Sequence, residues 1–463
     1  MDHFDPDAFH RIHESGDQLV SVHFNTEKSV LQNGQWDMEI AQPPFELSGK
    51  VPWAPDAWYL TSRPSFTMDP LFHAGTYYVQ EASGMFVSYA LKSIADAGKK
   101  IKVLDLCAAP GGKSTLIQSM ISAESLLVSN EVIKTRVPVL TQNITKWGRS
   151  NGIVTNNDPS HFKRMPGFFD IILIDAPCSG SGLYRKDPGA AASWSDELVN
   201  LCSQRQQRIL SDAWDCLKEG GFLIYSTCSY SKEENEDILD FLFHQYSCKT
   251  IDLKPDPLWN IVETRSDRGA FGYRFYPYKL SGEGFFLSVI QKLEDSDSNK
   301  SKHHSDISNS GRTNKARKNQ SAISGSTAQQ IGKWVLSDKL QYVSIEDSIH
   351  GLANGLVNDF ETLKNNLYLK KAGIRIGKAG EVDWIPDHEL ALANILRQDI
   401  PALHVSKSDA LHYLSGNPMD VDFPSRGWHT VCFHGQRLGW VKLLDKRMNN
   451  YYPKSWRIRQ SVF

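Results

Sequence analysis

The stretch IKVLDLCAAPGGKSTLI, residues 101–117, decides the fold because an apolar run leads through a glycine turn into a helical pattern. A nucleotide-phosphate loop needs the pattern Gly-x-x-x-x-Gly-Lys-Ser/Thr, since its backbone N–H groups curl around phosphate. Gly112 and Lys113 match the end of that pattern, but Cys107 stands in place of its first glycine and Pro110 removes an N–H donor. The stretch therefore predicts a strand, a tight turn and a helix, and it disfavours a phosphate loop.

Short aliphatic runs alternate with helical stretches over the first two thirds of the chain. The runs occupy 102–106, 126–130, 153–156, 169–175, 222–227 and 284–290. Nearly continuous apolar strands separated by helices are typical of a mostly parallel sheet covered on both faces, which predicts an α/β domain over 91–293. In such sheets ligands bind beyond the carboxyl ends of the strands, so the chemistry is expected just after each run.

The composition is that of an ordinary soluble protein, with 51 Lys and Arg residues against 53 Asp and Glu residues and a net charge of -2. No global field attracts nucleic acid or membrane, so any polyanion must meet a local patch. The N-terminus resembles neither a secretory signal nor a transit peptide, and no apolar run approaches the roughly 20 residues that span a bilayer. Cysteines without a CxxC pair argue against a disulfide framework and a structural zinc site. We expect a cytoplasmic protein with free thiols, no metal and no membrane partner.

A polar segment divides the chain. Residues 294–329 contain no aromatic residue and almost no aliphatic one, so they cannot bury enough apolar surface to offset their ordering entropy, and we predict a flexible linker. The segment before the α/β domain, 1–90, is predicted to be a small α+β domain. The part after the linker, 330–463, is predicted to be a separate C-terminal module.

Acidic residues follow several predicted strands at one edge of the sheet. Glu131 follows the second run, where a carboxylate can take both hydroxyls of a ribose. Asp158 follows the third run, and Asp175 ends the fourth. Each acid alone is more often a helix cap or a solvated residue, and the glycine turn alone is weakly specific. Together they predict that this edge holds a small adenosyl cofactor against the glycine backbone.

Two cysteines stand in polar turns at the same edge. Cys178 lies in DAPCSGSG after the fourth strand, and Cys228 lies in STCS after the fifth. The usual role of a cysteine is that of a small buried hydrophobe. We expect that role for Cys202, Cys216, Cys248 and Cys432. A nucleophilic thiol needs access and a lowered pKa, which polar turns and nearby cations provide, so Cys178 and Cys228 are the candidate nucleophiles.

These motifs carry a specific resemblance. LDLCAAPGGKST, SNEV, IDAPCSGSGLYRKDP and YSTCSYSKEENE resemble the motifs of the RNA cytosine-C5 methyltransferases of the Sun/nucleolar-protein family, which use S-adenosylmethionine. HAGTYYVQEASGMF at 73–86 resembles the segment that leads into that catalytic domain. GIRIGKAGEVDWIPDHELAL and LGWVKLLDKRMNNYYPKSWRIR resemble the PUA-like module of the bacterial small-subunit ribosomal RNA methyltransferase F type. The resemblance implies a Rossmann-like methyltransferase domain with a mostly parallel sheet, a small N-terminal α+β domain and a C-terminal PUA-like β-rich domain.

Residue roles follow from the resemblance position by position. It implies a nucleophile at Cys228, a thiol that assists product release at Cys178, and an acid at Asp175 that contacts the N3 edge of the base. It implies cofactor contacts at Cys107, Ala108, Ala109, Pro110, Gly111, Gly112, Lys113, Glu131, Asp158 and Asp175. For Lys113, a plain role in starting the helix is an equally good interpretation. Because C5 of cytosine is a poor nucleophile, addition of a thiolate at C6 is the implied way to activate it.

The resemblance also implies an RNA substrate, with ribosomal RNA as the first expectation and transfer RNA as the alternative. The stretch 437–459 mixes basic and aromatic residues that could meet it. They are Arg437, Lys442, Lys446, Arg447, Lys454, Arg457 and Arg459, with Trp440, Tyr451, Tyr452 and Trp456 between them. We expect the charges to contact phosphate and the aromatic side chains to form a core.

Other interpretations stay open at this stage. Arg185 and Lys186 either contact RNA phosphate or belong to a solvated loop. His23 stands where family members usually carry Arg, which puts a phosphate contact there in doubt. A nucleotide hydrolase built on the GGKS segment and a non-catalytic RNA-binding assembly factor are the rival functions. A monomer is expected.

Overall fold

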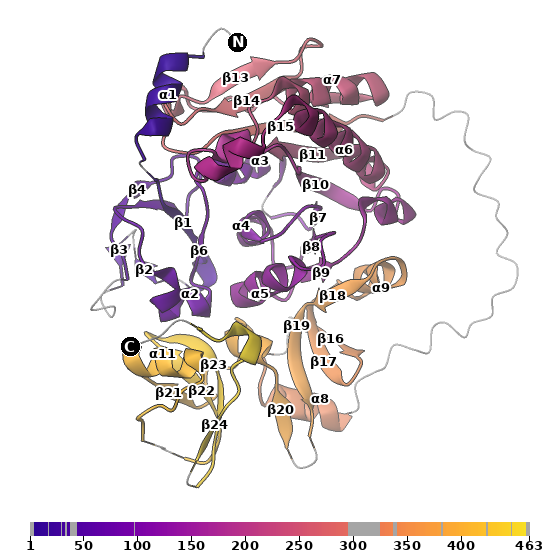
Figure 1. Ribbon diagram of the computed structural model, residues 1–463. Coiled ribbons are helices and arrows are strands. Elements are labelled where there is room, and N and C mark those ends of the chain that lie inside the picture. The colour runs from indigo at the N-terminus through magenta and orange to yellow at the C-terminus, as the bar shows by residue number, and fades with distance from the viewer. Residues whose placement is uncertain are drawn as a thin grey trace, which may run out of the picture.

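The computed structural model has a large mixed sheet at its centre, with helices on both faces (Figure 1). It describes residues 4–16, 18–28, 30–32, 35–37, 44–96, 98–294, 325–336, 340–380, 383–422, 425–445 and 447–459. The predicted linker, 294–329, lies mostly outside these residues. Its last residues belong to helix α8 (Gly325–Gly332) rather than to a linker, and Ile331 anchors that helix in a buried cluster. In the part of the chain that is described, no helix is both long and apolar enough to cross a membrane.

The central sheet has ten strands, of which the middle ones are parallel. The order along it is β13-β14-β15-β11-β10-β7-β8-β9-β18, and β12 pairs with β15. The parallel strands are β7 (Lys102–Asp105), β8 (Leu126–Asn130), β9 (Gly152–Thr155), β10 (Phe169–Asp175) and β11 (Leu217–Thr227). The antiparallel strands are β12 (Cys248–Thr250), β13 (Val262–Arg265), β14 (Phe271–Phe275), β15 (Phe285–Lys292) and β18 (Leu369–Ala372). Each apolar run forms a strand, and the prediction of a mostly parallel sheet is confirmed.

Successive residues of the inner strands pack against opposite layers of helices. One layer consists of α3 (Phe86–Ile94), α4 (Gly112–Met120) and α5 (Val137–Trp147), and the other of α6 (Asp196–Trp214), α7 (Glu236–Gln245) and α9 (Val357–Asn366). Val103 and Leu127 pack with the first layer, whereas Leu104 and Val128 pack with the second. Burial on both faces explains why these strands are apolar at nearly every position.

The N-terminal residues form a separate four-stranded sheet in the order β4-β5-β1-β6. The elements of this region are α1 (Pro6–Glu14), β1 (Ser21–Phe24), β2 (Leu31–Gln32), β3 (Gln35–Trp36), β4 (Leu47–Lys50), β5 (Ala57–Leu60), α2 (Pro70–Ala74) and β6 (Tyr77–Val79). β2 and β3 pair with each other in a two-stranded sheet of their own. This region is the small α+β domain that the sequence predicts. Lys28 ties it to the central domain, because its ammonium donates to the carbonyls of Ala74 and Lys146 at the ends of α2 and α5, at 2.8 and 2.6 Å.

The C-terminal residues form two further four-stranded sheets, drawn in orange and yellow at the bottom of Figure 1. The first contains β16 (Leu340–Ile345), β17 (Ser348–Ala353), β19 (Ile374–Ala379) and β20 (Trp384–Pro386), followed by α10 (His388–Leu392). The second contains β21 (Ala402–His404), β22 (Gly427–Phe433), β23 (Gln436–Leu443) and β24 (Met448–Asn450), with α11 (Lys407–Ser415) beside them.

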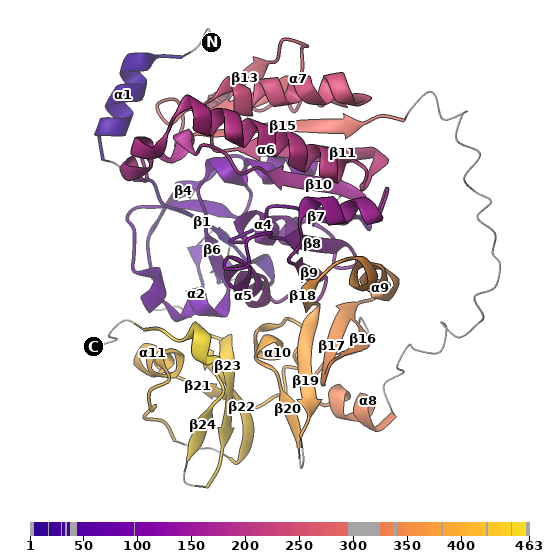
Figure 2. The same cartoon turned by 45° about the vertical axis from the view of Figure 1, so that its right-hand side comes forward.

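One strand from beyond the predicted linker belongs to the central sheet. β18 pairs antiparallel with β9, with Leu369 opposite Thr155, and both Figure 1 and Figure 2 show it at that edge. Phe360 and Leu363 of α9 are buried in the same cluster as Phe162 of the central domain. α9 and β18, which follow the predicted linker, therefore complete the central domain, whereas β16, β17, β19 and β20 form a sheet of their own, and the boundary at 330 stays a prediction.

Candidate active site

The glycine turn between β7 and α4 is held in shape by α5. Gly111 has a φ of 114°, in the left-handed region that favours glycine, and a Cβ there would lie 3.2 Å from a side chain of α5. The carbonyl of Pro110 accepts a hydrogen bond from Asn143 at 2.9 Å, and the carbonyl of Ala109 accepts one from Arg136. The turn predicted from the sequence is therefore present and fixed.

The neighbouring residues of the turn are placed so that a ligand could approach their backbone closely. Ala108 and Gly112 are buried, and the Ala108 N–H donates to the carbonyl of Asn130 at 2.8 Å, which joins the ends of β7 and β8. Cys107 is half-buried, and burial followed by the charges of nearby carboxylates raises the pKa of its thiol. Cys107 therefore lines the turn as a neutral thiol.

Asp105, which was not among the predicted site residues, is buried at the end of β7. Its Oδ2 accepts a hydrogen bond from the Ser114 hydroxyl at 2.6 Å, whereas its Oδ1 has no hydrogen-bond partner among the described residues. Burial raises the pKa of Asp105 to about 7, although the bond from Ser114 opposes the shift. An orphaned carboxylate oxygen beside the turn suits a cationic ligand group. The signal in the sequence was an acid inside an apolar strand.

The two acids after β8 and β9 differ in their surroundings. Glu131 is buried, and its carboxylate accepts the Ile133 N–H at 2.8 Å and lies 3.4 Å from the Arg136 guanidinium. Asp158 is partly exposed and caps the following helical turn by accepting the Ser160 N–H at 3.1 Å. Although partial burial opposes the shift, the bonds from Ser160 hold the pKa of Asp158 below its usual value. The carboxylate of Glu131 is therefore buried and held in place at this edge, whereas that of Asp158 already caps a helical turn.

Lys113 and Asp175 form an ion pair at the same edge. The ammonium of Lys113, in the first turn of α4, lies 2.7 Å from Oδ2 of Asp175 at the end of β10. Oδ1 of Asp175 accepts a hydrogen bond from the Ser226 hydroxyl at 2.8 Å. Burial alone would lower the pKa of Lys113, but the charge and hydrogen bond of Asp175 outweigh it and raise the pKa. Lys113 therefore points toward Asp175 at this edge, and its contact with a cofactor stays a prediction.

The two candidate thiols lie in contact. The Sγ atoms of Cys178 and Cys228 are 3.2 Å apart, and both residues are half-buried. The hydrogen bond with Cys228, burial, and the charges of Cys228 and Glu234 raise the pKa of Cys178 well above its usual value. Lys113 also interacts electrostatically with Cys228. The structure therefore brings together at one edge the residues that the sequence predicts just after the strands.

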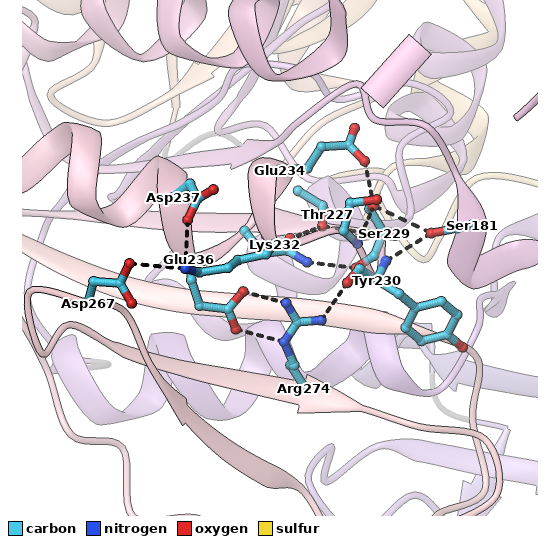
Figure 3. Close-up of polar contacts among 12 residues, drawn as sticks. Ser181, Thr227, Ser229, Tyr230, Lys232, Glu234, Glu236, Asp237, Asp267 and Arg274 are labelled. Carbon is cyan, nitrogen blue, oxygen red and sulfur yellow. Dashed lines mark hydrogen bonds and ion pairs between the residues drawn. The ribbon is translucent and has the colours of Figure 1, made fainter. Parts of the chain in front are cut away.

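Glu234, also missed from the sequence, connects the two cysteine turns. It is fully buried, and its carboxylate accepts hydrogen bonds from Ser179, which follows Cys178, and from Ser229, which follows Cys228. Figure 3 shows Glu234 above Ser229, with Ser181 beside it. A second buried carboxylate nearby, Glu236, instead pairs with Arg274.

Several other expectations are settled by burial. Arg185 is buried and binds Glu283 through two nitrogens, at 3.1 and 2.9 Å, so the interpretation of Arg185 as a phosphate contact or solvated charge is wrong. Lys186 is exposed. His23 is buried against Tyr78, and burial lowers the pKa of His23 to about 3, so its ring is neutral and offers no charge to phosphate.

The C-terminal basic and aromatic stretch separates only in part, since Tyr451 is exposed. Trp440 and Tyr452 are buried in apolar clusters. The exposed cations of the stretch are Arg447, Lys454 and Arg459, whereas Arg437 is half-buried and donates to the carbonyl of Arg397 at 3.0 Å. Lys446 lies outside the described residues.

The charges of the site disfavour a nucleotide phosphate. Asp105, Glu131 and Asp175 surround the glycine turn, and the only ammonium of the GGKS segment, that of Lys113, is already paired with Asp175. Carboxylates repel the anionic phosphates that the loop would have to cradle. The same carboxylates suit a ligand with an ammonium group and a ribose.

Comparisons with known proteins match the chain in three consecutive parts. The family models are the N-terminal domain of 16S rRNA methyltransferase RsmF over residues 2–82, 16S rRNA methyltransferase RsmB/F over 94–291, and the methyltransferase RsmF PUA domain over 401–458. The ribosomal RNA small subunit methyltransferase F of Aliivibrio fischeri (strain MJ11) is 29% identical over 450 residues, which cover 94% of this chain and 90% of that protein.

Solved structures agree with the fold of the catalytic part. A methyltransferase homologue from Pyrococcus horikoshii is 28% identical, with a TM-score of 0.52 over 62% of this chain and 90% of that one. NSun6 from Pyrococcus horikoshii has the same TM-score of 0.52 at 18% identity, over 62% of this chain and 94% of its own, which shows a shared fold.

Proposed function

Since the chain belongs to the RsmF-like 16S rRNA methyltransferases of the Sun/nucleolar-protein family, we propose that it methylates C5 of a cytosine in small-subunit ribosomal RNA through a covalent cysteine adduct. Its class is that of the S-adenosylmethionine-dependent methyltransferases. The observation that carries the proposal is the contact between the thiols of Cys178 and Cys228, 3.2 Å apart beside the Lys113–Asp175 ion pair. A single nucleophile would need only one of them.

The residues at the edge fit S-adenosylmethionine, which supplies an electrophilic methyl group when bound. The orphaned Oδ1 of Asp105 would accept the ammonium of its methionine part, and the buried carboxylate of Glu131 would take the ribose hydroxyls. The turn from Cys107 to Gly112 would lie along the cofactor, since Gly111 leaves the backbone without a side chain there. Asp158 would contribute at the adenine side through the oxygen that does not cap Ser160.

The surroundings of the thiols favour Cys228 as the nucleophile. Lys113, whose ammonium pairs with Asp175, is a cation that interacts electrostatically with Cys228. Cys178 instead faces the carboxylate of Glu234, which favours a protonated thiol. Cys228 therefore suits addition to the base, and Cys178 suits proton transfer during product release.

The reaction then runs in two stages. Cys228 forms a bond from sulfur to C6, and the negative charge that develops at N3 would be stabilised by Asp175 together with the Lys113 ammonium that donates to it. C5 accepts the methyl group. A base removes the C5 proton, with Cys178 assisting, and the bond between sulfur and C6 breaks with its electron pair returning to Cys228.

A cytosine must leave any base stack to reach thiols that lie in turns beyond a sheet. Flipping a base out costs a few kcal/mol and is easiest in a loop or an exposed single strand. The exposed cations Arg447, Lys454 and Arg459 of the C-terminal module would hold the flanking phosphates.

The test is methylation of separated RNA pools. Incubation with methyl-labelled S-adenosylmethionine is expected to place label in 5-methylcytidine of small-subunit ribosomal RNA from cells that lack this protein. Label confined to transfer RNA would change the substrate, and label on another nucleoside would reject the C5 assignment. RNA binding without transfer would favour an assembly factor, and tight ATP binding without transfer would revive the hydrolase.

A further inference from the structure

A single buried carboxylate connects the turns that carry the two thiols. Oε1 of Glu234 accepts the backbone N–H of Ser179 at 2.7 Å. Oε2 accepts the hydroxyl of Ser179 and also the hydroxyl of Ser229. Because these serines directly follow Cys178 and Cys228, Glu234 holds the residue next to each thiol.

Glu234 is itself fixed by its neighbours. Gln206 of α6 donates to Oε1 of Glu234 at 3.4 Å, and the hydroxyl of Tyr225 donates to its backbone carbonyl at 2.7 Å. The turns also bond directly, since the Gly182 N–H donates to the carbonyl of Cys228 at 2.8 Å. The carboxylate therefore cannot move without moving both turns.

Among the described residues, the hydrogen-bonding contacts of the Glu234 carboxylate are with neutral groups, the Cys202 thiol included. A hydroxyl from each serine, a backbone N–H and an amide stabilise its charge without cancelling it. The hydrogen bond with Cys228 and burial are the largest causes that raise the pKa of Cys178, and the charge of Glu234 raises it further. The opposite charge in the site, that of Lys113, acts on Cys228.

We propose that Glu234 is a positioning residue that fixes the two cysteine turns in register and makes the thiols unequal, so that Cys178 keeps its proton while Cys228 adds to the base. The catalytic consequence rests on the proposed function. The inequality of the thiols does not, and it can be measured without RNA.

Other ionisable groups also face the thiol pair. They are Lys113 from α4, Asp175 from β10, Tyr184 from the turn after Cys178, Cys202 from α6 and Tyr225 from β11. Glu234 differs from these groups because it bonds to both turns. All of these residues are kept when Glu234 alone is changed, so a difference between wild type and variant originates at Glu234.

The first experiment is the pH dependence of alkylation of Cys178 by iodoacetamide, followed by peptide mass spectrometry in a Cys228→Ser background. Glu234→Gln keeps an acceptor for the Ser179 N–H and an amide that can donate to the hydroxyls, but it removes the charge. We expect the alkylation profile to move to lower pH by on the order of one unit. Glu233→Gln, a neighbouring exposed carboxylate, is the matched control and should leave the profile in place. An unmoved profile in Glu234→Gln overturns the proposal.

The second experiment separates the charge of Glu234 from its hydrogen bonds to the two cysteine turns. Glu234→Asp keeps the charge but is one methylene too short to reach both serines, so its alkylation profile should stay with wild type while formation of the covalent RNA adduct slows about tenfold. A profile that moves in Glu234→Asp as it does in Glu234→Gln contradicts the role of charge. Adduct formation at the wild-type rate in Glu234→Asp contradicts the role of Glu234 in positioning the two cysteine turns.

Failure of the proposed function looks different. Wild-type protein that forms no adduct and transfers no methyl group to RNA would reject the catalytic consequence, whereas the iodoacetamide profiles would still decide whether Glu234 sets the thiols apart.

Discussion

At the scale of single residues, the site depends on which polar side chains the fold buries. Glu233 and Glu234 are neighbours in the run KEENE, yet Glu233 is exposed and Glu234 is fully buried. A charge run is normally a solvated face, and only the packing of η7 (Lys232–Glu234) against α6 distinguishes the two. The thiols and strand-end acids were predictable because they follow apolar strands. Glu234 was not, since nothing in its local pattern sets it apart.

Removing one thiol at a time is expected to stop the reaction at different stages. Cys178→Ala should accumulate a covalent RNA adduct, because addition proceeds while release is slowed by 10²-fold or more, on the order of what a general acid–base group contributes. Cys228→Ala should form no adduct and transfer no methyl group. Denaturing gels and methyl transfer measure both. Cys432→Ala is the control, because this buried cysteine lies on β22 in the C-terminal sheet. Normal turnover in Cys228→Ser with none in Cys178→Ser would reverse the assignment.

The ionisation of Asp105 should control cofactor binding. Its pKa of about 7 means that the free protein holds a proton there at lower pH, which must leave before the carboxylate can take an ammonium. Affinity for S-adenosylhomocysteine should therefore rise by up to about tenfold per pH unit from pH 5 to 7 and level off above the pKa. Titration calorimetry measures it.

The matched substitutions are Asp105→Asn and the exposed Asp96→Asn. Asp105→Asn should bind weakly with no pH dependence in this range, and Asp96→Asn should follow wild type. A pH dependence that persists in Asp105→Asn would remove Asp105 from the cofactor site.

At the scale of elements, the apolar runs were predictable as strands because burial on both faces leaves little room for polar residues. β18 was not, since its sequence LKKA carries two lysines. Lys371 is buried all the same, with its ammonium bonded to Glu389 and to the carbonyl of Gly373. Nothing in the local sequence therefore indicates that β18 joins the central sheet, because the contacts that bury its lysine come from distant residues.

The attachment of α9 and β18 predicts that the catalytic domain unfolds together with them. Leu363 is fully buried in the cluster that contains Phe162, so Leu363→Ala should lower the free energy of unfolding by about 2–5 kcal/mol. Thermal unfolding followed with bound S-adenosylhomocysteine should show one transition at lower temperature. Leu258→Ala, at a position 85% exposed, is the control. A separate early transition with cofactor binding intact would contradict the shared core.

The turn after β10 leaves no room for a larger residue at Gly182. A Cβ there would lie 2.5 Å from the Gly284 carbonyl oxygen and 2.8 Å from that of Cys228. Gly182→Ala should displace the Cys178 turn and lower methyl transfer by tenfold or more, on the order expected for small misplacements of reacting groups. Gly189→Ala, where the nearest atom to a Cβ is a side-chain oxygen at 3.4 Å, should retain activity. Wild-type activity in Gly182→Ala would show that the two turns need not touch.

At the scale of the whole molecule, the catalytic domain joins the N-terminal sheet on one side and the C-terminal sheets on another (Figure 2). The overall charge is near zero, so RNA binding must come from local groups.

Arg447, Lys454 and Arg459 are the exposed cations of the final stretch. Each one replaced by Gln should reduce the slope of log affinity against log salt by about one if it meets a phosphate. Lys99→Gln, exposed ahead of β7 at the opposite edge of the sheet, should leave the slope unchanged. An RNA affinity that does not fall with salt would exclude this stretch as the RNA contact.

The most direct test of the account is to identify the atom that carries the RNA in the trapped adduct. Cys178→Ala protein incubated with small-subunit ribosomal RNA and S-adenosylmethionine is digested with nuclease and protease, and the linked peptide is sequenced by mass spectrometry. The account predicts a methylated cytidine attached to Cys228. An adduct on any other residue, or methyl transfer without an adduct, would contradict it.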